Sequence, residues 1–276
     1  YADDTAIFCY RGKTVEGINR VLNSELNHVS RWLQKNFLTL NVKKTKTMLF
    51  ATKRKLASSN ESLKVYIKKD PIENVESFKY LGIWLDPSLT WTTNIDKLVS
   101  KVNKRIGLLR RIRNVLPQHT LNLLFKSLII PHFDYCNVVW GNACKTNLAR
   151  LDKLQNAAGK VILGLPRRYP TDILLEKLGW QKLHERRSTH LNVMVYKSLT
   201  CSLPSNLCNI FNRVHETHTH VTRSSTLSNL VPPVCKNNSD RRKFTSRGVV
   251  TFNSLPSSAK NPLPPNVKSF RYFLSQ

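Results

Sequence analysis

The chain opens with the tetrad Tyr1-Ala2-Asp3-Asp4, which is followed by the apolar run Ala6-Ile7-Phe8-Cys9-Tyr10. Two adjacent carboxylates in front of a β-prone run predict the tip of a hairpin that holds metal. Hard divalent cations such as Mg²⁺ bind carboxylate oxygens, and phosphoryl-transfer sites often hold two such ions. An Asp-Asp pair also occurs in ordinary solvated turns, so the tetrad alone leaves both interpretations open.

The charge of the chain is strongly one-sided. Its 276 residues carry 44 Lys and Arg against 17 Asp and Glu, a formal net charge of +27. Such a surface repels itself unless it meets a polyanion, and nucleic acid is the expected partner because each neutralised phosphate releases counterions. An acidic membrane surface is the alternative, but no basic amphipathic helix of the membrane-surface type dominates.

Other sequence features limit the class of protein. No apolar run approaches the roughly 20 residues that span a bilayer, so we expect no transmembrane helix and no membrane partner. We find no signal peptide, and the six cysteines contain no CxxC pair, which favours free thiols in an intracellular protein of the nucleus or cytoplasm. Because the chain begins at Tyr1, inside what reads as a motif, we expect a fragment whose N-terminal portion is missing.

The pattern over residues 1–93 is typical of an α+β fold. Thr14 can cap a helix, and apolar residues recur at helical spacing from Val15 to Leu33, which predicts an amphipathic helix lying against a sheet. The other elements expected here are strands over 47–50 and 63–67, a polar, basic loop over 53–60, and a strand pair over 75–85 that bends at Gly82.

A bundle of three helices is predicted next, over 94–113, from Pro117 to near Pro131, and over 147–163. The first helix carries seven cations against one acid, Asp96. A solvated helix face usually mixes both signs of charge, so this face predicts a nucleic-acid neighbour, with an ordinary solvated face as the alternative. The seven cations are Lys97, Lys101, Lys104, Arg105, Arg110, Arg111 and Arg113.

The last part of the chain, residues 166–276, predicts one further helix over 181–199. Beyond Cys201 it is rich in Ser, Asn and Pro, so we expect short, irregular or poorly ordered structure whose apolar pieces dock locally without forming a core. Four side chains of zinc-binding type occur there at the spacing C-x6-C-x6-H-x2-H, which fits no usual zinc module. They are Cys201, Cys208, His215 and His218.

Four features follow one another in a fixed order. They are the tetrad Tyr1-Ala2-Asp3-Asp4; Trp32-Leu33…Leu40-Asn41-Val42-Lys43-Lys44-Thr45…Met48-Leu49-Phe50; Phe78-Lys79-Tyr80-Leu81-Gly82…Leu85-Asp86…Leu89-Thr90-Trp91; and the basic helix. This series resembles the C-terminal part of the reverse transcriptases of LINE-type non-LTR retrotransposons. The resemblance covers about the first 165 residues, and later pieces such as Phe252-Asn253-Ser254-Leu255-Pro256 also look like the tail of such elements.

The resemblance implies an RNA-directed DNA polymerase that uses Mg²⁺ for two-metal nucleotidyl transfer. Asp3 would be a metal ligand, Asp4 a weaker or indirect one, and Tyr1 would lie close to the primer terminus. In such enzymes the metals activate the primer 3′-hydroxyl, bridge the triphosphate of the dNTP and stabilise the leaving pyrophosphate.

Two further positions match motifs of this family. Lys44 corresponds to the lysine of the next palm motif, where a cation would neutralise or protonate the pyrophosphate. An ordinary exposed lysine is the alternative, and the sequence leaves open which of Lys43, Lys44 and Lys46 points inward. Tyr80-Leu81-Gly82 matches the hairpin called the primer grip, with a plain structural bend as the alternative.

By the same resemblance, residues 1–93 would be the end of the palm, 94–165 a helical thumb and 166–276 a C-terminal region. The first thumb helix would follow the phosphates of a duplex between RNA template and DNA primer. The fingers and the upstream aspartate that completes the metal site are missing from these residues, so we expect no polymerisation by this chain alone. The alternatives are a truncated relic that only binds duplex and a small basic scaffold that binds proteins.

Overall fold

The computed structural model describes residues 5–8, 14–58, 63–68, 70–208, 210–217 and 222–274. The chain divides into two compact units, Tyr1–Lys97 and Leu98–Gln276. Residues 1–4, with the Asp-Asp pair, lie outside the described ranges, and residues 5–8 belong to no strand. No helix in the described ranges combines the length and the apolar character needed to cross a membrane.

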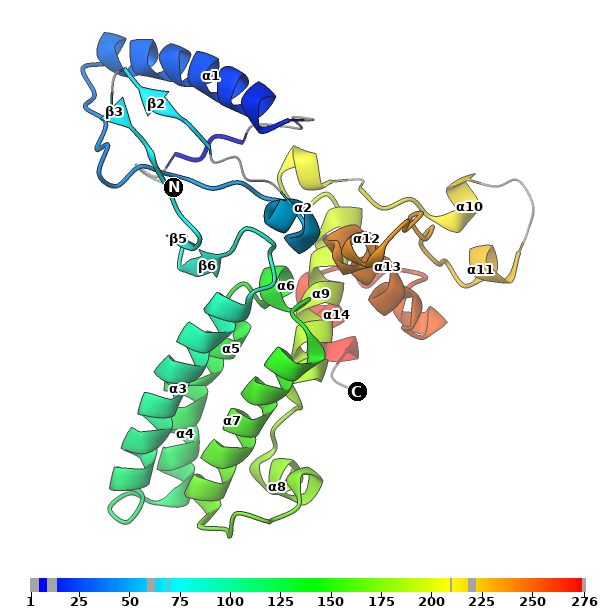
Figure 1. Cartoon of the computed structure of the whole chain (residues 1–276). Helices are drawn as coiled ribbons and strands as arrows, with labels where there is room; N and C mark the ends of the chain where they lie inside the picture. The colour runs from blue at the N-terminus through cyan, green and yellow to red at the C-terminus, as the bar shows by residue number, and fades with distance from the viewer. Residues whose placement is uncertain are drawn as a thin grey trace. The chain divides into compact units, whose positions relative to one another are not determined.

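The first unit is built on α1 (Val15–Lys35), the amphipathic helix expected from the spacing of its apolar residues. Thr14 caps it as predicted, because its side chain accepts a hydrogen bond from the Gly17 N–H at 3.2 Å. The helix lies against the hairpin of β2 (Tyr66–Ile67) and β3 (Asp70–Pro71), as Figure 1 shows. Their shared core consists of Leu26, Leu63, Val65, Ile67 and Ile72.

Two asparagines of α1 hold the segment that leads into β2. The Asn23 side chain donates to the Lys64 carbonyl at 3.0 Å and accepts from the Tyr66 N–H at 2.8 Å. Asn19 accepts from the Lys64 N–H at 3.0 Å. Within 63–67 the odd-numbered residues are buried and the even-numbered ones exposed, which confirms the predicted alternation. The strand is shorter than expected because its first residues bond to helix side chains instead of a neighbouring strand.

Two expectations for the middle of this unit need correction. The strand predicted over 47–50 is β1 (Lys46–Thr47), which pairs in parallel with β4 (Glu73–Asn74) and ends at Thr47. The basic segment predicted as a loop instead forms α2 (Lys53–Ser58). Its Lys, Arg, Leu and Ala residues are good helix formers, and the prediction gave their charge more weight than their helix propensity.

The expected strand pair with a bend is confirmed. β5 (Phe78–Tyr80) pairs antiparallel with β6 (Ile83–Leu85), and Leu81 and Gly82 form the turn. Both turn residues have positive φ, 45° for Leu81 and 85° for Gly82. A two-residue turn of this kind matches the twist of the flanking strands, and glycine adopts it without a steric cost.

The turn after β6 is held by one carboxylate. Asp86 accepts hydrogen bonds from three backbone N–H groups, those of Ser88, Thr90 and Trp91, at 3.2, 2.9 and 2.8 Å. Two residues in this turn, Leu89 and Trp91, adopt positive φ. The Asp86 contacts therefore hold a backbone path that non-glycine residues rarely take, and this path ends where α3 begins.

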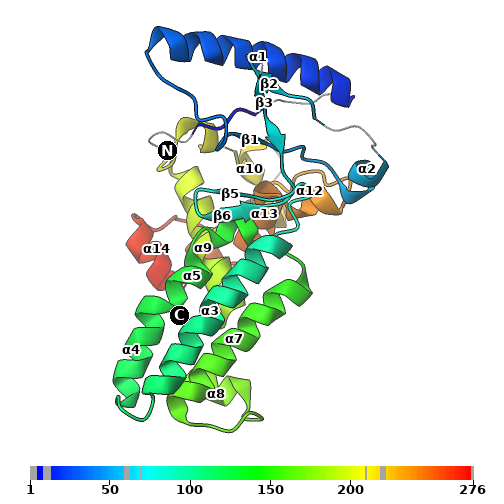
Figure 2. The ribbon, with the colours of Figure 1, turned by 60° about the vertical axis from the view of Figure 1, so that its left-hand side comes forward.

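The second unit is helical, and the predicted helices are present with small shifts of their ends. The helix predicted from Pro117 to near Pro131 ends at Leu128, and the short α5, α6 and α8 were not predicted. In both views α3, α4 and α7 run alongside one another (Figures 1 and 2). The helices are α3 (Thr92–Ile112), which runs from the end of the first unit, α4 (Gln118–Leu128), α5 (Ile130–Asp134), α6 (Asn137–Trp140), α7 (Lys145–Leu163), α8 (Thr171–Leu178) and α9 (Leu183–Leu199).

Aromatic side chains anchor this helical core. The Phe125 ring stacks on the Trp180 ring with 3.7 Å between centroids, and Trp180 Nε1 donates to Asn122 Oδ1 at 2.8 Å. Trp140 is buried, and its Nε1 donates to the Tyr135 carbonyl at 2.8 Å. Trp140 is therefore buried and Trp180 half-buried, and each indole satisfies its ring N–H.

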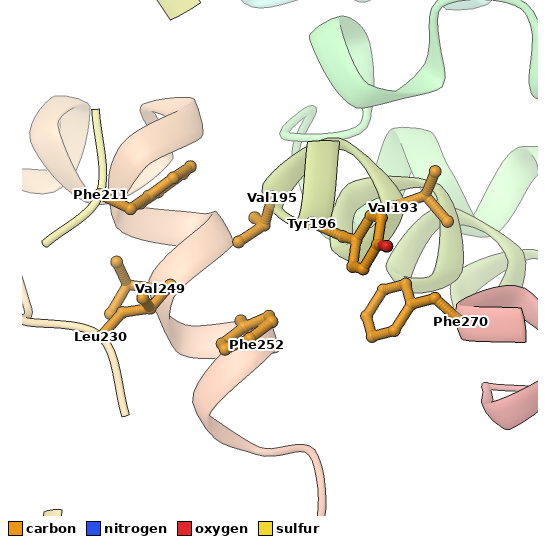
Figure 3. Close-up of a cluster of buried hydrophobic side chains, with 8 residues drawn as sticks. All are labelled: Val193, Val195, Tyr196, Phe211, Leu230, Val249, Phe252 and Phe270. Carbon is orange, nitrogen blue, oxygen red and sulfur yellow. The ribbon is translucent and has the colours of Figure 1, made fainter. Parts of the chain in front are cut away.

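After α9 the chain forms only short elements, as expected, but the prediction that they lack a core was wrong. They are the 3₁₀ turns η1 (Ser205–Leu207) and η2 (Ser257–Ala259) and the helices α10 (Val214–Thr217), α11 (Arg223–Thr226), α12 (Asn238–Arg242), α13 (Phe244–Asn253) and α14 (Val267–Phe273). Figure 3 shows their apolar side chains packed on α9. The core members are Val193, Val195, Tyr196, Phe211, Leu230, Val249, Phe252 and Phe270.

Specific contacts explain why this tail packs so closely. A Cβ at Gly248 would lie 2.8 Å from a methyl of Val195, so α13 approaches α9 at a point where only glycine fits. The Asn253 side chain donates to the Leu230 carbonyl at 2.9 Å and accepts from the Leu230 N–H at 2.8 Å. The motif around Asn253 thus joins α13 to a distant loop, a pairing that sequence spacing does not reveal.

Candidate nucleic-acid interface

The second unit presents one face of α3 that carries positive charge. Val102, Ile106 and Leu109 are buried on the opposite face. No carboxylate of the described residues lies within ion-pair distance of the cations on this helix. The exposed cations beyond residue 97 are Lys101, Lys104, Arg110, Arg111 and Arg113, and Arg105 is half-buried.

Lys97 belongs to the first unit and has a different environment. Its Nζ lies 5.3 Å from the centroid of the Trp84 ring, a distance at which an ammonium is attracted to the face of an indole. The Trp84 N–H donates to Asn94 Oδ1 at 3.1 Å. The Lys97 side chain is exposed and extends over β6 at the start of α3.

His132 is a basic residue near this face that the sequence did not reveal. It lies on α5, and burial, followed by the charges of Arg105 and Lys101, lowers its pKa from 6.5 to about 4. The ring is therefore neutral at pH 7. In sequence it is 27 residues from Arg105, and no motif connects the two positions.

The β5–β6 hairpin contains the three residues matched to the primer grip. Leu81 at the tip is exposed, Tyr80 is half-buried, and Gly82 completes the turn. The bend is therefore present, whereas contact with a primer stays a prediction.

The three lysines around the next motif differ in their surroundings. Lys43 and Lys44 are exposed, and the Lys44 N–H donates to Asn41 Oδ1 at 3.1 Å within a turn. Lys46 is half-buried, and its ammonium forms an ion pair with Glu73. Among the three, Lys46 points inward, and the ammonium groups of Lys43 and Lys44 have no ion-pair partner among the described carboxylates.

The metal ligands expected at the start of the chain, Asp3 and Asp4, lie outside the described residues, as does Tyr1. In the ranges that are described, no group of three His, Cys, Asp or Glu side chains is placed to hold a metal ion. Neither Cys201 nor Cys208 forms a disulfide, and His218 falls in an undescribed segment. The zinc spacing in the tail therefore has no counterpart in the described residues.

A cluster of charged groups lies further from the basic face, between α5 and α9. Arg186 forms a two-pronged ion pair with Asp134, with its Nε 3.1 Å from Asp134 Oδ1. His190 lies next to this pair within hydrogen-bond distance of the Asn137 side chain, and burial is the largest cause that lowers its pKa. These contacts connect α9 to α5 and α6, and we assign them a role in stability.

No protein-family model matches the chain, and no solved structure matches it. Curated proteins do match. The chain is 26% identical over 168 residues to a probable RNA-directed DNA polymerase from transposon X-element of Drosophila melanogaster, covering 59% of this chain and 18% of that protein. It is 26% identical over 219 residues to the RNA-directed DNA polymerase from mobile element jockey of the same species, covering 74% and 23%.

A third relative is a retrovirus-related Pol polyprotein from the type-1 retrotransposable element R1 2 of Nasonia vitripennis. The identity is 25% over 190 residues, which cover 65% of this chain and 45% of the relative. The chain thus spans less than half of each of these three relatives. The resemblance to RNA-directed DNA polymerases of non-LTR retrotransposons, predicted from four ordered motifs, is confirmed.

Proposed function

We propose that this chain is the part of a non-LTR retrotransposon reverse transcriptase that holds the template–primer duplex. The observation that carries the proposal is the face of α3, where exposed cations have no described carboxylate partner. Unpaired cations on an ordered helix attract a regular row of phosphates, and the relatives named above are polymerases that copy RNA.

In this proposal residues 1–93 form the end of the palm, 94–165 the thumb, and 166–276 a C-terminal region that supports the thumb. Phosphate contacts from α3 give affinity without reading base sequence. The Tyr80-Leu81-Gly82 turn lies at the primer, and Lys44 acts on the pyrophosphate of the incoming dNTP. Support for the last two assignments comes from their match to family motifs and from their exposure.

The metal chemistry is also part of the proposal. Asp3 and Asp4 are the residues that would hold Mg²⁺, which would activate the primer hydroxyl and neutralise the triphosphate. Two carboxylates from one hairpin are too few to hold two metals. The 276-residue chain mixed with RNA template, DNA primer, dNTPs and Mg²⁺ is expected to give no extended product, and any primer extension would contradict this.

Duplex binding is tested by fluorescence anisotropy with a labelled RNA–DNA hybrid over a range of salt concentrations. We expect the logarithm of the binding constant to fall linearly with the logarithm of salt concentration. The triple variant Lys101→Gln, Lys104→Gln, Arg111→Gln should flatten this slope by about 0.9 for each phosphate contact that is lost.

A second triple variant serves as the matched control, because it removes the same charge from exposed positions in the tail. It consists of Lys236→Gln, Arg241→Gln and Lys268→Gln. If α3 is the interface, the control keeps nearly the full salt slope. Equal losses in the two triple variants would show that binding depends only on net charge, and a slope near zero in the parent chain would exclude phosphate contacts.

A further inference from the structure

A group of three basic side chains from two helices lies next to the face of α3. Lys101 and Arg105 are four residues apart on α3 and therefore share one side of that helix. His132 comes from α5, near enough for both charges to act on its ring. All three belong to the second unit.

Arg105 has an incomplete set of hydrogen bonds. Its side chain is half-buried, and its Nη1 is covered from solvent without a hydrogen-bond partner among the described residues. A buried N–H that is left unsatisfied costs about 1–3 kcal/mol, so such groups in folded proteins usually have an explanation, which includes a missing ligand. The atom needs an acceptor, and a guanidinium favours an anionic one.

The surrounding helices provide no free carboxylate for this group. Asp96 is the single acid of α3 and lies nine residues, about 13 Å along the helix, from Arg105. Helix α4 carries His119 and Lys126 and no acid. On α5, Asp134 already forms the ion pair with Arg186 of α9.

Two acids remain on the packed helices. Glu185 of α9 accepts from the Lys182 N–H at 3.1 Å. Asp152 of α7 is half-buried, and the charges of Arg187 and His184 act on its carboxylate. The other titratable and cationic side chains are His184, Arg186, Arg187, His190, Tyr196 and Lys197 on α9 and Lys145, Arg150, Lys153 and Lys160 on α7. No carboxylate of the described residues forms an ion pair with Lys101 or Arg105, so an anionic ligand would suit this group.

We infer that Lys101, Arg105 and His132 form a subsite for one backbone phosphate of a bound nucleic acid, and that His132 takes up a proton from solvent when the phosphate binds. The inference rests on the proposed function, because it names a particular phosphate contact of the proposed interface. Lys101 and Arg105 supply permanent charge, and Arg105 Nη1 gains an acceptor. His132 supplies a neutral ring in the free protein and a cationic donor in the complex.

The direction of the pH dependence follows from the charges. In the free protein two cations disfavour the protonated ring, and its pKa is about 4. A phosphate placed among the three groups cancels part of this repulsion, so the pKa of His132 rises on binding. Because the complex then binds one more proton than the free protein, affinity increases as pH falls through the raised pKa towards about 4.

The direct test follows the His132 ring by NMR during a pH titration, with and without a short RNA–DNA hybrid. The His132 resonance, assigned through the His132→Gln variant, is expected to titrate at higher pH in the complex. His119, which is exposed on α4 with its Nε2 3.2 Å from Thr120 Oγ1, is the internal reference. A parallel arm replaces the hybrid by inorganic phosphate at the same ionic strength.

Binding measurements at pH 7.5 and pH 5.5 provide the second readout. One linked proton changes affinity by at most about tenfold per pH unit. We expect the parent chain and His119→Gln to bind the hybrid more tightly at pH 5.5, and His132→Gln to lose most of this gain while keeping affinity at pH 7.5.

The possible results separate the two proposals. Hybrid binding without a shift of the His132 titration overturns the subsite and leaves the proposed function intact. A shift with inorganic phosphate but none with the hybrid also overturns it, because the site would then bind free anions and not the nucleic-acid backbone. If the hybrid does not bind at all, the proposed function itself fails.

Discussion

The two units of this chain are held together in different ways. In the first unit a helix lies on very short strands, and side-chain hydrogen bonds from Asn19, Asn23 and Asp86 hold the connecting backbone. In the second unit helices pack side by side, and Phe125 and Phe252 are completely buried. Two-stranded hairpins bury only one face, whereas packed helices enclose a core. The first unit therefore depends more on polar side-chain contacts, and the second depends more on apolar burial.

The exposed surfaces differ in the same sense. In the first unit Phe37 is 96% exposed and Trp32 is 58% exposed, both near the C-terminal end of α1. In the second unit the large exposed groups on α3 are mostly cations. Trp32 and Phe37 thus lie in water beside a small core, while α3 buries its apolar face and exposes charge.

The largest expected effect comes from truncating the second core. Phe252→Ala removes a ring with no exposed surface and should lower the free energy of unfolding by about 3–5 kcal/mol. Leu26→Ala in the first unit should cost less, about 2 kcal/mol, because that core is shallower. Peptide-level hydrogen exchange reports each unit separately. Val250→Ala, at a 71% exposed position next to Val249, is the control and should change stability by less than about 0.5 kcal/mol.

The next effect tests the polar contacts of the first unit. Asp86→Ala leaves three backbone N–H groups without their acceptor, and we expect a loss of about 2–3 kcal/mol, seen as faster hydrogen exchange over residues 78–97. Asp86→Asn keeps one oxygen acceptor and should cost less. If Asp86→Ala and Asp86→Asn gave the same rate of hydrogen exchange over residues 78–97, the oxygen that the asparagine keeps would contribute little to this turn.

Ion pairs give a smaller difference between the units. Asp134 and Arg186 are 24% and 27% exposed, so Asp134→Asn should cost about 1–2 kcal/mol in thermal unfolding. Glu16 and Arg20 in α1 are 75% and 79% exposed, so Glu16→Gln should cost at most about 0.5 kcal/mol. A cost for Glu16→Gln as large as that for Asp134→Asn would contradict the importance of burial.

Acidification should weaken the second unit. The pKa of His132 is about 4 in the folded chain, below the ordinary 6.5 of histidine, so between these values the unfolded state binds the proton that the folded state excludes. Stability therefore falls as pH decreases from 7 to 5. His132→Gln should reduce this fall in melting temperature. The control His28→Gln in α1 leaves His132 in place and should show the full fall in melting temperature. If His132→Gln shows the same fall as His28→Gln, the proposed cause is wrong.

The smallest effect concerns backbone strain in the first unit. Phe37 adopts φ of 55° with its ring in solvent. Phe37→Gly removes the strain of a left-handed conformation and adds chain entropy to the unfolded state, with a net gain of about 0.5 kcal/mol expected in urea unfolding. A loss above about 1 kcal/mol would show that the ring makes stabilising contacts.

Local signals in the sequence predicted much of the secondary structure. Thr14 and the apolar spacing after it predicted α1, Gly82 predicted the turn between β5 and β6, and the stripe on α3 predicted its buried face. Such features depend on residues within one or two turns of each other. The α2 helix was missed because charge was taken as a sign of a loop, although Lys and Arg favour helices.

The candidate site was only partly predictable. The cations of α3 lie within one helix, so their spacing already placed them on a common element. His132 could not be associated with Lys101 and Arg105, because the chain first has to fold through α4 before α5 returns to α3. The assignments of Asp3, Asp4, Lys44 and Gly82 to catalysis and primer binding come from motif resemblance, and they stay predictions.

The sequence by itself determined the charge, the helix and hairpin pattern, and the resemblance to polymerases of non-LTR retrotransposons, since each depends on composition or on ordered local motifs. Only the tertiary structure decided that the tail after Cys201 has a core. Its apolar segments are separated by polar ones in the sequence, and the core forms because they pack together with side chains of α9. The same holds for the close approach at Gly248 and the neighbours of His132, which depend on contacts between residues far apart in the chain.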